Sequence, residues 1–114
     1  MRLGFLLGLL ACQDKAVESA DAFCADAPTV TWESHTEALL TQWCQPCHAS
    51  DAADRHDAPA SVTFDTEDDA VQWAERILAV ATGDAPTMPP SIELPEEDQL
   101  HLEVWLRCEV GVGG

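Results

Sequence analysis

Apolar residues recur every three or four positions in three stretches of the chain, roughly residues 34–47, 66–82 and 95–108. This spacing predicts three amphipathic helices whose apolar stripes face a common core. The stripes are Leu39, Leu40, Trp43, Cys44 and Cys47 in the first helix, Ala70, Trp73, Ala74, Ile77, Leu78 and Ala81 in the second, and Leu102, Trp105 and Leu106 in the third. The pattern therefore predicts a small all-α domain.

Residues that favour helix ends lie at the borders of these stretches. Ser34, followed by Glu37 three positions later, predicts a capping box at the start of the first helix. Thr66 is expected to cap the second helix, and Gly83 stands where its C-terminal stop is expected. Pro95 suits the first turn of the third helix. Each predicted helix thus has at least one terminal signal of its own.

The remaining segments lack a helical pattern. Residues 29–32 and 61–64 alternate polar and apolar side chains, but such short isolated segments make marginal strands, so extended loops are expected. Residues 12–28 are small and acidic without periodicity and predict a tether. The glycine-rich residues 111–114 predict a frayed tail. The folded domain is therefore expected to span residues 29–110.

The N-terminus has the features of an export signal. Arg2 precedes an apolar stretch, and Leu9-Leu10-Ala11-Cys12 resembles a bacterial lipobox, in which the chain is cut before a lipid-bearing cysteine. This predicts a lipoprotein-type signal peptide over residues 1–11 and lipidation of Cys12, which would anchor the protein to a membrane surface without spanning it. The expected location is the periplasmic side of a bacterial membrane, or the cell surface. An ordinary secretory peptide, or merely an apolar start, is the alternative.

Acidic residues far outnumber basic ones, 21 against 5, for a formal net charge of −16. Nucleic-acid binding is excluded as a function, because it needs clustered Lys and Arg. The apolar fraction of 46% is too high for a disordered acidic tail. Cleavage before Cys12 would remove Arg2, leaving 4 basic against 21 acidic residues and a net charge of −17. Such a surface favours partners with basic patches.

The chemistry of the chain centres on Cys44-Gln45-Pro46-Cys47-His48, a C-x-x-C-H motif typical of covalent haem attachment. Cysteines three apart on a helix face the same side, so both sulfurs can bond the two vinyl groups of one porphyrin. The adjacent His48 can then offer a ring nitrogen to the iron. One alternative is a redox dithiol, but such dithiols occur in folds of alternating strands and helices, which this sequence lacks. The other alternative is half of a zinc site.

From residue 31 to residue 109 the sequence resembles class I cytochrome c, through this motif, a downstream Met-Pro loop and a closing helix with an aromatic residue. The resemblance implies one covalent haem c, surrounded by three main helices and their loops, with His48 as the proximal iron ligand. It implies Met88, in Pro86-Thr87-Met88-Pro89-Pro90, as the distal ligand. It also implies that the closing helix packs on the first one through Trp105.

The assignment of Met88 is supported by elimination, because the other methionine, Met1, belongs to the predicted signal peptide. The flanking prolines should stiffen the loop that presents the thioether. A loop methionine that merely fills a gap is the alternative, and His56 is the second candidate for the distal position. The sequence also departs from the family, since Pro46 should distort the helix locally and the surface is acidic where the family has a basic rim. No partner identity is therefore carried over.

The sequence also supports predictions for three further residues, Arg55, Cys24 and Cys108. Arg55 is a candidate for a haem propionate contact, and a surface ion pair with Asp54 or Asp57 is equally compatible with the sequence. Once Cys12, Cys44 and Cys47 are assigned, Cys24 and Cys108 remain, and in an oxidising compartment a disulfide between them is expected. Two unpaired buried thiols are the alternative.

These features predict a one-electron carrier of positive potential rather than an enzyme, because histidine–methionine ligation fills both axial positions. The sequence holds no recognisable catalytic triad or glycine-rich phosphate loop. A haem-based sensor or small-ligand-binding lipoprotein with a displaceable Met88 is the alternative. A lipoprotein without haem, in which Cys44 and Cys47 form a plain disulfide, is a third hypothesis.

Overall fold

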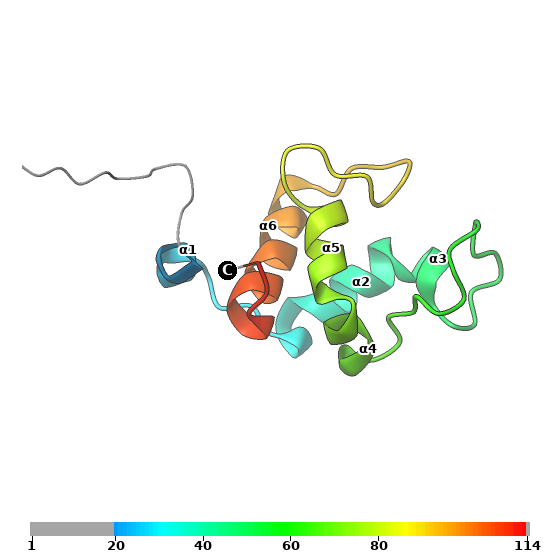
Figure 1. Ribbon diagram of the computed structural model, residues 1–114, viewed down its shortest axis with the longest axis horizontal. Coiled ribbons are helices and arrows are strands. Elements are labelled where there is room, and N and C mark those ends of the chain that lie inside the picture. Colours follow the sequence, from blue (N-terminus) through cyan, green and yellow to red (C-terminus); the bar gives the residue numbers. More distant parts are fainter. Residues whose placement is uncertain (1–19, 114) are drawn as a thin grey trace, which may run out of the picture.

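The computed structural model describes residues 20–113, and within that range it is helical, with no strand. In chain order the elements are α1 (Ala20–Asp26), η1 (Trp32–Thr36), α2 (Glu37–Trp43), α3 (Gln45–His48), α4 (Glu67–Gln72), α5 (Ala74–Ala81), α6 (Glu96–Val104) and η2 (Trp105–Val110), where η marks a π-helical turn (Figure 1). The predicted all-α class is confirmed. Of the two predicted extended loops, residues 29–31 and 62–64 are loops, whereas Ser61 lies in a turn and Trp32 begins η1, where its buried ring joins the core.

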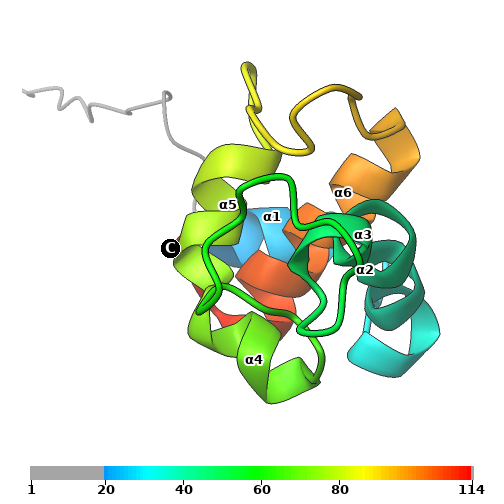
Figure 2. The same cartoon turned by 90° about the vertical axis from the view of Figure 1, so that its right-hand side faces the viewer.

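The core forms around the closing helix, whose predicted stripe is fully buried. Leu102, Trp105 and Leu106 have no exposed surface, and α6 with η2 lies between α1 and α5 (Figures 1 and 2). The ring of Trp105 packs against that of Trp32 in η1, with centroids 5.6 Å apart. The expected packing of the last helix on the first is therefore present, and it is aromatic in character.

The first predicted helix begins earlier than its sequence signal indicated. Thr31, in an extended conformation, caps η1: its hydroxyl accepts from the Ser34 N–H, and its own N–H donates to the Ser34 hydroxyl at 2.9 Å. The capping box predicted for Ser34 and Glu37 is wrong, since Ser34 is the inner partner of the box. The reason is burial of Trp32, which extends the apolar face one turn towards the N-terminus.

The same helix is divided between α2 and α3, as the proline in the motif suggested. Cys44 lies at the break with φ −115° and ψ −39°, and Pro46 stands in the first turn of α3. Proline has no N–H to donate and its ring crowds the preceding turn, so the helix cannot pass through unchanged. The distortion remains local, because the His48 N–H still donates to the Cys44 carbonyl at 2.9 Å.

The second predicted helix is confirmed at both ends and divided in the middle. The Thr66 hydroxyl accepts from the Asp69 N–H at 3.1 Å, which is the expected cap. At Trp73, with φ −102° and ψ 11°, the N–H donates to Ala70 three residues back, and α5 begins at the next residue. Gly83 follows the end of α5 with φ +93°, a left-handed conformation that glycine adopts without strain.

The C-terminal tail is better ordered than its glycine content indicated. Gly111, with φ +91°, ends η2, and the N–H groups of Gly111 and Val112 donate to the Leu106 carbonyl at 2.9 and 3.0 Å. Val112 packs against the core. The predicted fraying is therefore wrong for these two residues, because a left-handed glycine closes the helix and turns an apolar side chain inwards.

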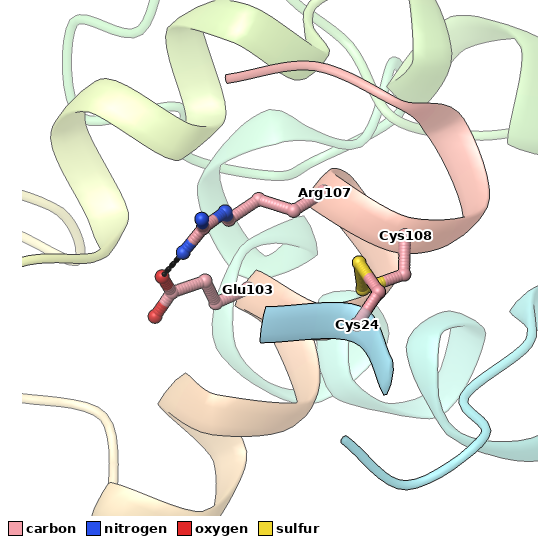
Figure 3. The surroundings of a disulfide bond; sticks show 4 residues. All are labelled: Cys24, Glu103, Arg107 and Cys108. Carbon is pink, nitrogen blue, oxygen red and sulfur yellow. Dashed lines mark hydrogen bonds and ion pairs between the residues drawn. A yellow bond between two sulfur atoms is a disulfide. The ribbon is translucent and has the colours of Figure 1, made fainter. Parts of the chain in front are cut away.

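Part of the predicted tether is the helix α1, and a disulfide joins it to η2. The bond links Cys24 and Cys108, 84 positions apart, with Cα atoms 5.6 Å apart (Figure 3). Beside it the Arg107 guanidinium lies 4.0 Å from the centre of the Phe23 ring and pairs with Glu103 at 2.8 Å. The expected disulfide is confirmed.

The predicted signal peptide and Cys12 lie outside the residues that the structure describes. Within residues 20–113, no helix is long and apolar enough to cross a membrane.

Candidate functional site

The C-x-x-C-H motif occupies the short helix α3, at the end of the molecule away from α1 (Figure 1). Cys44 and Cys47 are both half-buried, and neither forms a disulfide. The Cys47 N–H donates to the Cys44 carbonyl at 3.1 Å, so the two residues belong to one helical turn. The arrangement leaves two free thiols on a single turn, as covalent attachment of one flat ring requires.

Burial distinguishes Cys44 from a redox-active cysteine. Loss of hydration and, to a smaller extent, the neighbouring Cys47 together raise the pKa of the Cys44 thiol to about 12. Reactive thiols in redox dithiols have lowered pKa values, because the thiolate is the nucleophile. The environment of Cys44 therefore favours a neutral thiol and argues against the redox-dithiol alternative.

The imidazole of His48 is held by the loop that follows residue 60. Nδ1 lies 3.0 Å from the Val62 carbonyl oxygen, and the Phe64 ring packs on the imidazole with centroids 4.8 Å apart. A carbonyl can only accept, so the hydrogen bond places the proton of the neutral ring on Nδ1. Nε2 then carries the lone pair. This is the tautomer in which Nε2 could ligate a metal.

Arg55 organises this loop through main-chain carbonyls. Nη1 donates to Ala49 at 2.5 Å, and Nη2 donates to Pro59 at 2.7 Å and to Val62 at 3.1 Å. The ion pair with Asp54 or Asp57 that the sequence left open does not occur in the described residues; Asp54 instead lies 3.6 Å from His56. The propionate contact of Arg55 stays a prediction.

Asp65 is a further residue of the site, and it was not singled out from the sequence. Its carboxylate accepts from Gln45 at 3.2 Å and from both the N–H and the hydroxyl of Ser50. The hydrogen bonds from Ser50, then that from Gln45, lower the pKa of this carboxyl, and the Arg55 charge acts in the same direction. Asp65 thus ties both ends of α3 to the segment that enters α4.

Met88 lies on the loop between α5 and α6, which runs along the top of the molecule in Figure 1. The N–H groups of Thr87 and Met88 both donate to the Val80 carbonyl, at 2.8 and 2.9 Å, which fixes the loop on α5. Met88 is 41% exposed and lines a cavity of about 200 Å³ with Pro86 and Pro89, among others. No residue of the motif lines this cavity. The cavity beside Met88 is therefore separate from Cys44, Cys47 and His48, and the iron ligation by Met88 stays a prediction.

His56 is the second predicted candidate for the distal ligand. His56 is exposed, in a left-handed conformation with φ +49°, and its Nε2 is 3.6 Å from Asp54. Between residues 20 and 113, no three His, Cys, Asp or Glu side chains gather as a metal site would need. The further ligands of a half zinc site are thus missing from this part of the chain.

No match to this chain appears among protein-family models, curated proteins or solved structures. Its function must therefore be inferred from its own residues and their geometry.

Proposed function

We propose that this protein is a mono-haem c-type cytochrome, a one-electron carrier in an extracytoplasmic electron-transfer chain. The observation that carries the proposal is the hydrogen bond from His48 Nδ1 to the Val62 carbonyl, beside two free thiols of Cys44 and Cys47. That bond directs the lone pair to Nε2, which is the form of histidine that ligates a metal.

The residues present fit a covalent haem c. Cys44 and Cys47 would hold it through thioether bonds, and His48 would ligate the iron from one side. The haem, when bound, supplies reversible one-electron oxidation and reduction. Phe64, packed against the His48 ring, limits rotation of that ligand. Met88 is the proposed ligand on the opposite side, and a thioether there would favour the reduced state.

The acidic surface suits a carrier that docks on basic partners. The net charge of −16 should steer the chain towards positive patches, and association should slow as salt rises. Export and a lipid anchor on Cys12 would keep the protein at a membrane surface, where such partners reside. Metabolic labelling with a radioactive fatty acid tests the anchor, because Cys12→Ala should take up no label.

Haem attachment is tested by producing the protein in a host that matures c-type cytochromes. We expect a haem stain that survives a denaturing gel and an intact mass that exceeds the polypeptide by one haem. Cys44→Ser/Cys47→Ser should lose both signals, whereas Cys24→Ser/Cys108→Ser, a change of the same chemistry elsewhere, should keep them. A colourless protein with the mass of its polypeptide alone would refute the proposal.

The exposure of Met88 keeps a second function open, that of a haem-based sensor whose distal ligand is displaced by a small molecule. The two functions differ in the ferric absorption band at the red end of the spectrum, which marks a methionine–iron bond. A carrier should show this band and lose it in Met88→Ala. Rapid binding of carbon monoxide to the reduced wild-type protein, without loss of structure, would favour the sensor.

A further inference from the structure

We propose that Arg55 is a positioning residue for His48. Both side chains donate to the carbonyl of Val62, and through this shared acceptor Arg55 weakens the electron donation of His48 and thereby raises the reduction potential of the site. The inference rests on the proposed haem function. It concerns a contact between three residues of this chain, and it differs from a direct contact of Arg55 with a propionate.

The geometry converges on one oxygen atom. The Val62 carbonyl accepts from His48 Nδ1 at 3.0 Å and from Arg55 Nη2 at 3.1 Å. A carbonyl oxygen has two lone pairs, so both donors can bond at once. One donor is a neutral imidazole and the other is a permanent cation.

The cation changes the strength of the other bond. A charged donor draws electron density from the oxygen and makes it a weaker acceptor towards the imidazole. The Nδ1 proton is then held more firmly by the ring, so His48 donates less electron density through Nε2. Hydrogen bonding at the outer nitrogen is a recognised control of ligand basicity and of redox potential. A less basic proximal ligand stabilises the reduced state.

Arg55 is fixed in the position that this role requires. Nη1 donates to the Ala49 carbonyl, next to His48 in the chain, and Nη2 also donates to Pro59. The guanidinium therefore bridges the end of α3 and the loop that supplies the acceptor. Because these bonds hold both the cation and the carbonyl, the effect on His48 is built into the folded chain.

The experiment compares the holoprotein with Arg55→Gln and Arg55→Lys, and uses Arg76→Gln as the matched control. Arg76 is exposed on α5, so its replacement removes the same charge away from the shared carbonyl. Redox titration measures the potential. Proton NMR of the reduced protein measures the His48 Nδ1–H resonance, which moves downfield as its hydrogen bond strengthens.

For Arg55→Gln we expect the Nδ1–H resonance to move downfield. The ratio of reduced to oxidised protein at a fixed ambient potential should fall about threefold to tenfold, and tenfold corresponds to about 59 mV for one electron. Arg55→Lys keeps a cationic donor and should change both readouts less. It also keeps the test usable if Arg55→Gln does not fold. Arg76→Gln should move neither.

Two results would overturn the inference. A lowered potential with an unmoved Nδ1–H resonance would show that Arg55 acts only as a charge at a distance. Unchanged values of both readouts would show that it has no influence on the ligand. These outcomes differ from failure of the proposed function, since they arise in a protein that carries haem, whereas a wild-type protein without haem refutes both proposals.

Discussion

The disulfide between Cys24 and Cys108 offers a quantitative test of how α1 is held. The two cysteines are 84 positions apart, so the bond closes most of the folded chain into a loop. The chain-entropy relation gives about 4.5 kcal/mol for a loop of this length, and removal of a native disulfide from a small domain costs about 2–5 kcal/mol. We expect Cys24→Ser/Cys108→Ser to lower the free energy of unfolding by about 3 kcal/mol.

The contacts beside the disulfide should depend on it. Phe23 packs on the core, with the Arg107 guanidinium 4.0 Å from its ring centre, a contact of about 0.5–1 kcal/mol at an exposed site. A helix as short as α1 is unstable alone in water. Once the disulfide is removed, α1 should separate from η2, and Phe23 should then contribute little.

Urea unfolding of four proteins measures this coupling: wild type, Phe23→Ala, the cysteine double variant, and the combination of all three changes. In the presence of the disulfide, Phe23→Ala should cost about 1–2 kcal/mol, from lost burial and the ring contact. In its absence the same change should cost less than about 0.5 kcal/mol. Equal costs in both backgrounds would refute the reasoning, and so would a cysteine double variant as stable as the wild type.

Three further outcomes are expected from the fold. Thr66→Ala removes the cap of α4 and should cost about 1 kcal/mol in denaturant unfolding, whereas Thr41→Ala, on the exposed face of α2, should not. Leu102→Ala creates a core cavity and should cost about 2–5 kcal/mol, against less than about 0.5 kcal/mol for Leu100→Ala, which is 43% exposed in the same helix; equal costs would contradict the assigned core. Asp65 has a folded pKa below its ordinary value of 3.8, so its stabilisation is complete above pH 3.8 and is lost as pH falls through the folded pKa. Asp65→Asn should therefore be less stable than wild type at neutral pH, with a difference that shrinks below pH 3.8 in acid unfolding; a difference independent of pH would contradict this linkage.

The helical content could be predicted because it is a local property. Leu102, Trp105 and Leu106 recur at helical spacing, and all three are fully buried. Helix ends were harder to predict, because several neighbouring residues can cap a helix and tertiary packing decides which of them does so. Ser34 has the residue type of a cap, yet burial of Trp32 transfers that role to Thr31. The break at Trp73 has no local signal, because neither proline nor glycine stands there.

The chemistry of the candidate site was likewise predictable from the sequence only in part. Cys44, Cys47 and His48 are contiguous, so their spacing alone determined which side chains share one helical turn. Which nitrogen of His48 bears the proton depends on Val62, 14 positions away, and the second donor to that carbonyl is Arg55. Hydrogen bonds between distant segments form only when the chain brings donor and acceptor within about 3 Å, and no sequence spacing encodes that approach. The sequence therefore determined the reactive groups, and the tertiary structure decided their orientation and their electrostatic surroundings.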